Sequence, residues 1–497
     1  MHARRAGASI DRRFTLLALA PFLVLIAFAC WAMSSPAGSS PDDDFHLTSI
    51  WCATGEKQGT CEAVPGEPTL RAVAPELHEA GECFKFQSTV SGACVERSGA
   101  SGELIETNRG NFAGSYPPIY YTSVGIFAGA GLSDLNMVLL RVLNAAVFLG
   151  IAVALHLLLP IRLRTTSMWM WIIGLVPLGV FLIASNNPSA WAVISGGAVW
   201  LATLGYFTST GWRRWSLLAL AGIATLMGAG ARADSAAYAG VGIVVACVLA
   251  AERTKRFAIA VAPFAIALVV AGLFFLFTRQ STVLSVGLTG QSDPSALPVA
   301  ELVIQNLLAV PSLWAGVFGT WELGWLDTPM PGIVWVGALG VFAAMVFSGI
   351  RSMSWRKATA LGIVTAALIL VPVWVLVQSR VLVGAEVQPR YILPLMVMLG
   401  GVALLQVTGR AIDLTRTQAW VVGGTLIVAN AVALHTNIRR YISGLDIVDW
   451  NLNHHVEWWW EIPLSPMVIW LIGSLAFAGA MVIMVRWLLS RPSEATA

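Results

Sequence analysis

The sequence predicts an all-α polytopic membrane protein, a bundle of about twelve transmembrane helices with a large, disulfide-bearing first extracytoplasmic loop. The first observation is composition: of 497 residues, 57% are hydrophobic and 11% are charged, and the mean hydropathy is +0.74. A soluble domain usually contains about a quarter charged residues. The composition therefore excludes an ordinary cytosolic enzyme, a disordered chain and a nucleic-acid-binding protein, which would need a strongly basic surface.

The second observation is the length of the apolar segments. A helix needs about 20 apolar residues to cross roughly 30 Å of hydrocarbon. The segments that approach this length are Phe14–Met33, Leu135–Leu159, Met168–Ala184, Ala190–Phe207, Ser216–Gly230, Ser235–Ala250, Phe257–Phe277, Gly332–Ile350, Ala358–Val377, Tyr391–Val407, Ala419–His435 and Met467–Leu489. They divide the chain into a first helix (1–33), a first outer loop (34–134), helices two to seven (135–277), a second outer loop (278–331), helices eight to eleven (332–436), an interfacial outer segment (437–466) and the last helix with its tail (467–497).

The third observation is the position of the charges. With the N-terminus in the cytoplasm, every inner segment is basic, and these segments hold most of the 30 Lys and Arg residues. This is the distribution that the positive-inside rule describes, so we expect both termini in the cytoplasm. Arg12 and Arg13 before the first apolar run also resemble a signal peptide. We favour an uncleaved first helix, because the acidic cluster just beyond it needs a fixed place at the membrane.

The first outer loop contains four cysteines, which in an exported segment indicate two disulfides. The three possible pairings stay open, and a metal site is the alternative, although no Cys-x-x-Cys spacing supports it. The cysteines are Cys52, Cys61, Cys83 and Cys94.

Two other outer segments are apolar enough to touch the membrane. Ala300–Phe318 is interrupted by Pro311, which favours a re-entrant or interfacial helix over a full span. Trp458, Trp459 and Trp460 indicate an aromatic belt on a helix at the outer surface, with acceptor or lipid contact as the alternative.

The sharpest polar cluster follows the first helix, where Asp42, Asp43 and His46 occur within one turn of a possible helix. Asp42 and His46 are spaced i, i+4, and Asp43 and His46 i, i+3, so these pairs share a face. Adjacent carboxylates raise each other's pKa, which suits a general base. The same three side chains could hold a divalent cation such as Mg²⁺ or Mn²⁺. The alternative is an acidic N-cap of a helix near the membrane.

Further charged residues occur where predicted helices reach the outer surface. Arginine binds phosphate through its planar fork of donors, so a group of arginines there could clamp a lipid phosphate. Interfacial ion pairing, such as Arg390 with Glu386, is the alternative. Arg141 falls inside a predicted helix and indicates either a functional partner or snorkelling. The residues at the outer helix ends are Arg232, Asp234, Glu322, Asp327, Arg380, Glu386 and Arg390.

Four separated stretches make the sequence similar to a known family. The chain resembles the bacterial membrane-protein family called domain of unknown function 2142, which belongs with the GT-C type of membrane glycosyltransferases. It departs from the family pattern at Asp43, where the family has Glu, at Asp44, which is often Pro, and at Pro389, where it has Gly. The four stretches are Pro41-Asp42-Asp43-Asp44-Phe45-His46, Tyr116-Pro117-Pro118-Ile119-Tyr120-Tyr121, Gly324-Trp325-Leu326-Asp327-Thr328-Pro329-Met330-Pro331 and Gln388-Pro389-Arg390-Tyr391-Ile392-Leu393-Pro394.

The resemblance implies a GT-C-like bundle in the bacterial plasma membrane that moves a sugar from a polyprenyl-phosphate donor to a cell-envelope glycan or lipid-linked acceptor. It implies an outer-loop acidic residue as base or metal ligand, a role that we assign to Asp42, with Asp43 as second choice. The implied partners are the lipid donor, the glycan acceptor and membrane lipid, with no nucleic acid. A transporter or flippase of lipid-linked saccharides and a non-catalytic envelope scaffold are the rival functions.

Roles for the other residues follow from the same resemblance. Phosphate binding is assigned to Arg390 first and Arg232 second, with Arg380 as a third candidate. Acceptor binding is assigned to the aromatic motif and to the acidic residues of the third stretch, namely Tyr116, Tyr120, Tyr121, Asp327 and Glu322.

Overall fold

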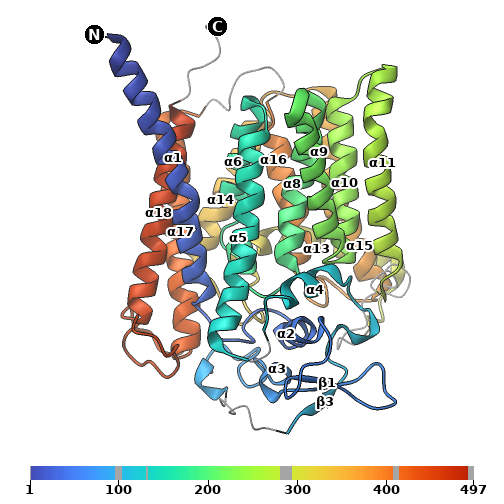
Figure 1. Ribbon diagram of the computed structural model, residues 1–497, viewed down its shortest axis with the longest axis vertical. Coiled ribbons are helices and arrows are strands. Elements are labelled where there is room, and N and C mark those ends of the chain that lie inside the picture. Colours follow the sequence, from blue (N-terminus) through green and yellow to red (C-terminus); the bar gives the residue numbers. More distant parts are fainter. Residues whose placement is uncertain (1, 96–102, 130–131, 280–293, 407–413, 491–497) are drawn as a thin grey trace.

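The computed structural model describes residues 2–95, 103–129, 132–279, 294–406 and 414–490. Long helices stand side by side, and a smaller, irregular layer closes one end of the bundle (Figure 1). The elements in chain order are α1 (His2–Ala32), α2 (Asp43–Cys52), β1 (Cys61–Ala63), β2 (Arg71–Val73), α3 (Pro75–His78), η1 (Gly92–Cys94), β3 (Ile105–Thr107), η2 (Asn111–Ala113), α4 (Ile119–Gly125), α5 (Asp134–Leu158), α6 (Ile161–Gly174), α7 (Leu178–Ile183), α8 (Ser189–Thr208), α9 (Gly211–Ala229), α10 (Ala233–Ala250), α11 (Lys255–Leu276), α13 (Val299–Ala315), η4 (Gly316–Thr320), α14 (Gly332–Gly349), α15 (Trp355–Gln378), α16 (Pro389–Leu404), α17 (Arg416–Ile442) and α18 (Pro466–Leu489).

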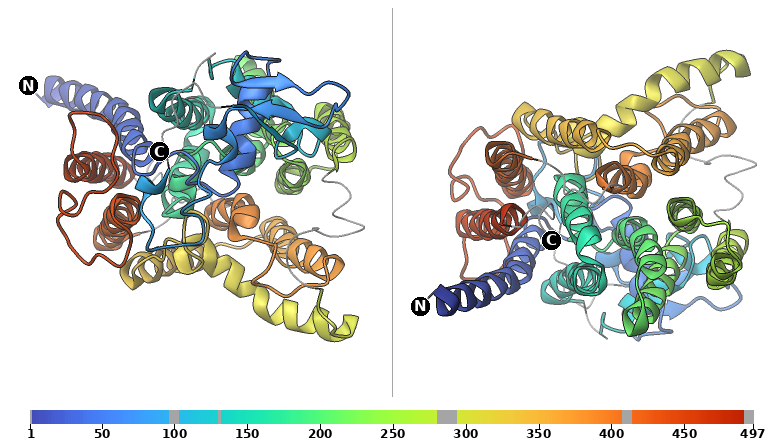
Figure 2. Two further views of the ribbon diagram at one scale, coloured as in Figure 1. Left: turned by 90° about the horizontal axis from the view of Figure 1, so that it is seen from below. Right: turned by 90° about the horizontal axis from the view of Figure 1, so that it is seen from above.

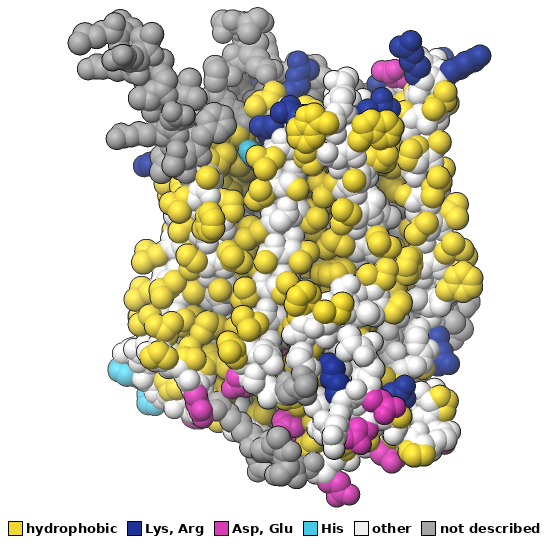
Figure 3. Space-filling model, in the orientation of Figure 1, with side chains coloured by type: hydrophobic (Ala, Val, Ile, Leu, Met, Phe, Trp, Pro, Cys, Tyr) yellow, Lys and Arg dark blue, Asp and Glu magenta, His cyan; other side chains and the backbone are white. Residues whose placement is uncertain are grey.

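The prediction of an all-α polytopic membrane protein is confirmed. Within the described ranges, nine helices are long and apolar enough to cross a membrane, and the apolar parts of α1 and α16 are shorter. On the face shown in Figure 3, hydrophobic side chains form a broad belt; Lys and Arg predominate above it, and most of the Asp and Glu lie below it together with a few Lys and Arg. The N-terminal end of α1 and the C-terminal end of α18 lie at the upper end, opposite the irregular layer (Figure 1). The nine helices are α5, α8, α10, α11, α13 with its π-helical extension, α14, α15, α17 and α18.

Two predicted spans differ from the structure. The segment Met168–Ala184 is not one helix, because the chain breaks at Pro177 between α6 and α7. Proline removes a backbone donor and clashes with the preceding turn, so a helix ends before it. The segment 216–230 lies in α9, which begins five residues earlier, at Gly211.

Helix α13 has the length and composition of a span, but the chain enters and leaves it at the same end of the bundle. Helix α11 descends to the end that carries the irregular layer, and α14 starts there again (Figure 1). Seen from below, α13 is drawn along its length, whereas α17 and α18 are seen end-on (Figure 2). The re-entrant or interfacial character of this helix stays a prediction, since its length and composition also fit a full span.

The first outer loop folds into a small layer of its own. Its three short strands pair antiparallel in the order β1-β2-β3, beside α2, α3 and α4. The prediction of two disulfides is confirmed, and the pairs are Cys52–Cys61 and Cys83–Cys94. Both bridges join cysteines that are neighbours in sequence, so each closes a short loop.

The chain between α1 and α2 is irregular and buried, and we call residues 33–41 the buried segment. A buried carbonyl group must accept a hydrogen bond, and here side chains from distant elements supply most of the donors. Arg141 of α5, which is 1% exposed, donates to the carbonyl oxygens of Ala32, Ser35 and Pro36 at 2.6–2.8 Å. Arg141 is therefore a capping group for the end of α1, and snorkelling does not describe it.

Other side chains complete the same pattern. Their indole, hydroxyl, guanidinium and amide groups donate to the carbonyl oxygens of residues 33, 38, 39 and 41 at 2.7–3.2 Å. The donors are Trp460, Trp325, Tyr441, Arg390 and Asn187. The expected tryptophan belt is thus wrong in part, since residues 458–460 form no helix and Trp458 and Trp460 are buried in an aromatic cluster with Phe84.

The disulfide pairing gives a first prediction. A non-reducing digest of the purified protein should release one cross-linked peptide pair containing Cys52 and Cys61 and another containing Cys83 and Cys94. Mass spectrometry identifies the pairs, and a reduced sample is the control. A linkage between Cys61 and Cys83 would contradict the structure of the outer layer.

Candidate functional site

Asp42 directly follows the buried segment and is the N-cap residue of α2. Its backbone is left-handed, with φ 59°, a conformation that aspartate tolerates better than most residues. Asp42 Oδ2 accepts from Arg390 Nη2 at 2.6 Å, and Oδ1 accepts from Arg109 Nη2 at 3.3 Å. One carboxylate therefore joins the start of α16 to the loop between β3 and α4.

The two arginines face Asp42 from different sides. Arg390 is buried, its side chain 3% exposed, whereas that of Arg109 is 42% exposed. Arg109 makes its shorter contacts with Asp44, through Nε to Oδ2 at 2.7 Å and Nη2 to Oδ1 at 3.0 Å. Arg109 is thus anchored by Asp44, and its contact with Asp42 is the weaker one.

Burial raises the pKa of Asp42, but the charges of Arg390, His46 and Arg109 act in the opposite direction. The net result holds the pKa of Asp42 below its usual range. Asp42 is consequently an ionised member of an ion pair, with a side chain that stays 32% exposed.

Asp43 and His46 do not join Asp42 in one site. Asp43 is fully buried, accepts from Ser40 Oγ at 2.7 Å and lies 4.0 Å from Arg141 Nη2. His46 is fully buried as well, and its Nδ1 contacts the hydroxyl of Tyr121 at 2.8 Å. Burial raises the pKa of Asp43 and lowers that of His46.

The expected divalent-cation site at Asp42, Asp43 and His46 is not assembled. Each of these side chains has a different partner, and the described ranges contain no group of three His, Cys, Asp or Glu residues placed to hold a metal ion. The residues present do not fit Mg²⁺ or Mn²⁺, so the chemistry considered below uses none.

Arg232, at the start of α10, is a second buried guanidinium close to the first. Its Nε and Nη2 donate to both oxygens of Asp234 at 2.9 and 2.7 Å. The guanidinium carbon lies 4.7 Å from the ring centre of Tyr391 and 5.8 Å from that of Tyr116. Arg390 lies over Tyr391 too, at 5.0 Å, so both arginines contact this one ring.

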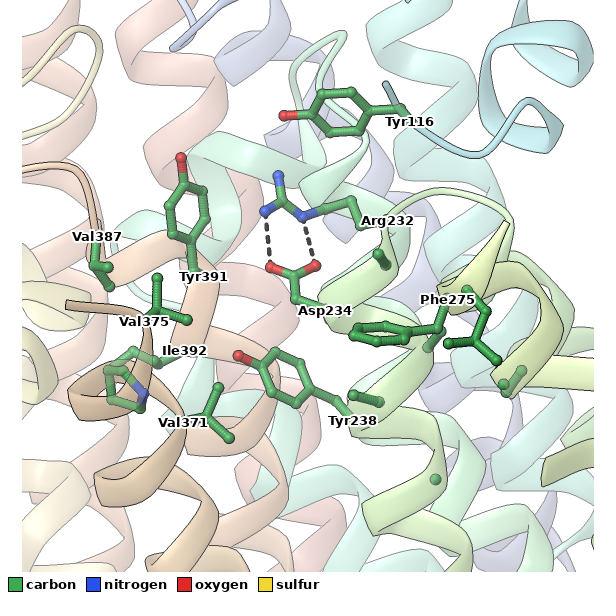
Figure 4. A pocket seen from close by; sticks show the side chains of 18 of the residues that line it. Tyr116, Arg232, Asp234, Tyr238, Phe275, Val371, Val375, Val387, Tyr391 and Ile392 are labelled. Atoms are coloured by element: carbon green, nitrogen blue, oxygen red, sulfur yellow. Dashed lines mark hydrogen bonds and ion pairs between the residues drawn. The ribbon is translucent and has the colours of Figure 1, made fainter. Parts of the chain in front are cut away.

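One nitrogen of Arg232 remains open. Nη1 is buried and has no hydrogen-bond partner among the described residues. Figure 4 shows it pointing away from Asp234, on the side where the hydroxyls of Tyr116 and Tyr391 lie. An unpaired buried donor is unfavourable, so this position suits an anionic or oxygen-rich ligand.

A cavity of about 650 Å³ begins at this nitrogen and continues between the helices. Tyr116, Arg232, Asp234 and Tyr391 line its polar end. The remaining walls are mostly small or apolar residues of α10, α11, α15 and α16, and α11 is the least buried of the candidate spans. The cavity is therefore amphipathic: one end is charged, and the rest fits a hydrocarbon chain.

Of the three tyrosines predicted to bind the acceptor, one lines the cavity and two do not. Tyr116 lines the cavity, and burial raises its pKa to about 12, so it stays a neutral hydroxyl. Tyr120 is buried against Asn144 and Trp191, and Tyr121 against His46, so neither lines the cavity.

Asp327, Glu322 and Arg380 also lie apart from the cavity lining. Asp327 accepts from Arg440 Nη2 at 2.9 Å, and neither side chain is more than 1% exposed. Arg380 donates to the carbonyl oxygens of Ser295 and Leu297 at 3.0 and 2.8 Å. The structure thus gives Asp327 and Arg380 structural partners.

Sequence reasoning missed Arg109 and gave Tyr391 no role. Arg109 lies in an outer loop without an apolar pattern, so nothing in its neighbourhood distinguishes it from a surface arginine. Tyr391 directly follows Arg390 in a recognised motif, and this adjacency was the available signal.

Fold and site together define a multi-pass helical membrane protein with an amphipathic cavity beside buried Arg–Asp pairs. The chain belongs to the family described as "Predicted membrane protein (DUF2142)", whose model matches residues 25–399. None of the curated proteins matches the sequence.

One solved structure is similar, the crystal structure of ArnT from Cupriavidus metallidurans bound to undecaprenyl phosphate. The two chains are 13% identical, the match covers 76% of this chain and 68% of that one, and the TM-score is 0.36. This degree of similarity assigns a role to no residue.

Asp327 gives a stability prediction. Replacing Asp327 with Asn leaves Arg440 buried without a counter-charge, so we expect the free energy of unfolding to fall by about 3–5 kcal/mol. Denaturation of the purified protein in detergent measures this change. The control is Glu322→Gln, a partly exposed neighbour, for which a change within about 0.5 kcal/mol is expected. Equal effects of the two substitutions would contradict the structural role of the Asp327–Arg440 pair.

The lowered pKa of Asp42 predicts a pH dependence. A carboxyl group with a depressed folded-state pKa contributes stability above its unfolded pKa, about 3.9 for Asp. That contribution is lost as the pH falls toward the folded-state pKa. The difference in stability between the wild type and Asp42→Asn should therefore be constant from about pH 5 to 8 and shrink below about pH 4. A difference that changes around neutral pH would show that Asp42 is not held ionised by its arginines.

Proposed function

We propose that this protein is a membrane glycosyltransferase of the GT-C type. It transfers a sugar from a polyprenyl-phosphate donor to a cell-envelope glycan or lipid-linked acceptor at the extracytoplasmic face of the bacterial plasma membrane. The observation that carries the proposal is the amphipathic cavity, whose charged end contains the open nitrogen of Arg232 and lies close to the Asp42–Arg390 pair.

The cavity supports a lipid-linked donor. A polyprenyl phosphate has a long apolar chain and a single compact anion, and the cavity pairs apolar walls with a buried guanidinium. Arg232 Nη1 and the hydroxyls of Tyr116 and Tyr391 would meet the phosphate oxygens. The hydrocarbon chain would lie along α10, α11 and α15, where α11 faces lipid.

Asp42 supports the transfer chemistry. Its partly exposed carboxylate would accept the proton of the acceptor hydroxyl as that oxygen attacks the anomeric carbon. The bond between this carbon and the lipid phosphate oxygen breaks, and the phosphate leaves with its electron pair. Buried arginines stabilise the charge that develops on it, which is a large source of rate enhancement in a site shielded from water.

The rival functions predict other arrangements. A transporter or flippase would place paired charges near the middle of the membrane. Here the Arg–Asp pairs that involve Asp42, Asp234 and Asp327 lie at helix ends or in the outer layer. A scaffold would tolerate replacement of Asp42 whenever the protein folds.

Replacement of Asp42 by Asn in cells lacking the native copy tests the proposal. Asn keeps the shape and tolerates the left-handed backbone, but it cannot accept the proton, so we expect a loss of about 100-fold or more in transfer. Protein abundance in the membrane and the envelope glycan profile are measured together.

Asp449→Asn is the matched control, an Asp-to-Asn change in the segment after α17, outside the cavity lining. It should leave both the abundance and the glycan profile unchanged. A normal glycan with normal Asp42→Asn abundance would remove Asp42 as the base and favour the transporter or scaffold.

A further inference from the structure

Asp42 and Arg390 carry two separate roles in the proposed reaction, yet they are bonded to each other. A general base needs a free oxygen lone pair, and a phosphate-binding arginine needs a free positive charge. The 2.6 Å hydrogen bond between Arg390 Nη2 and Asp42 Oδ2 uses part of the hydrogen-bonding capacity of each group. The ion pair therefore weakens Asp42 as a proton acceptor and partly neutralises the charge of Arg390.

We infer that Asp42 is the resting counter-ion of Arg390, and that the anionic headgroup of the lipid donor displaces it. The donor phosphate takes the guanidinium, and the released carboxylate then becomes available to the acceptor hydroxyl. This inference rests on the proposed function and adds an order to it, in which the lipid phosphate binds before the base is competent.

The surroundings of Arg390 favour such an exchange. Arg390 and Arg232 lie 5.0 and 4.7 Å from the centre of the same Tyr391 ring, so a ligand that reaches the open nitrogen of Arg232 is close to Arg390. Arg390 Nε is buried and has no partner among the described residues, so the guanidinium retains a donor for an incoming oxygen. Asp42 is the more exposed partner, with 32% exposure against 3% for Arg390, so it can exchange this contact for water or an acceptor hydroxyl.

The second arginine explains why release activates the base. Arg109 is anchored by two short hydrogen bonds to Asp44 and approaches Asp42 only to 3.3 Å. Once the phosphate binds Arg390, the 3.3 Å contact with Arg109 is the arginine contact that Asp42 keeps. Loss of the stronger pairing raises the pKa of Asp42 toward that of an ordinary carboxyl group, which makes it a better proton acceptor.

Binding of undecaprenyl phosphate to the purified full-length protein in lipid nanodiscs tests the inference without any need to know the sugar. If the carboxylate competes with the phosphate, Asp42→Asn should bind this probe about tenfold more tightly than the wild type does. Arg390→Gln should bind it more weakly. The double variant Asp42→Asn with Arg390→Gln should lose the gain, because the effect acts through Arg390.

Asp44→Asn is the matched control for general electrostatics. It removes a carboxylate two residues away that contacts Arg109 rather than Arg390, so its affinity for the probe should change by less than about twofold. A gain in Asp44→Asn equal to that in Asp42→Asn would overturn the inference, since any lost negative charge would then suffice.

Two further outcomes separate this inference from the proposed function. Saturable binding that weakens in Arg232→Gln but does not tighten in Asp42→Asn would overturn the exchange and leave the lipid-phosphate cavity in place. The absence of saturable binding in the wild type and in Asp42→Asn alike would overturn the proposed function. Circular dichroism and elution volume confirm that each variant is folded before it is scored.

Discussion

The structure depends on one constraint, which is that the carbonyl groups of the buried segment must accept hydrogen bonds where water is scarce. The chain leaves α1 as irregular backbone, and α5, α16, α17 and three loops supply the donors. This fixes the end of the segment, and Asp42 is its next residue. The hydrogen bonds to the backbone of the buried segment thus fix the position of Asp42, the candidate base.

The second organising feature is the pairing of aspartates with arginines at one end of the bundle. Asp42, Asp234 and Asp327 each accept from a buried arginine, and Asp44 accepts from Arg109. Pairing avoids the penalty of an isolated buried ion. It also leaves little net charge at the cavity, where Arg232 Nη1 is a buried donor without a hydrogen-bond partner among the described residues.

The sequence predicted what local rules control and missed what long-range packing controls. Hydropathy located the helices, and a recognised motif brought Asp42 and Arg390, 348 residues apart, into one hypothesis. The i, i+4 rule placed Asp42 and His46 on one face, but His46 Nδ1 contacts the hydroxyl of Tyr121, a partner 75 residues away that no local rule reveals. Asp327 was predicted to bind the acceptor. In the structure it pairs with Arg440 of α17, 113 residues away, and a local motif cannot reveal such a partner. Arg109 carried no local signal at all.

The hydrogen bonds of the buried segment join residues that are synthesised far apart in time. The two disulfides join residues only 9 and 11 positions apart, so the outer layer can close them soon after export. The donors Trp325, Arg390 and Trp460 lie 287, 349 and 427 positions from their acceptors. At about 5–20 residues per second, the ribosome makes these donors many seconds after it has made the segment. The hydrogen bonds of the buried segment are therefore complete only after Trp460, its last donor in sequence, has been synthesised.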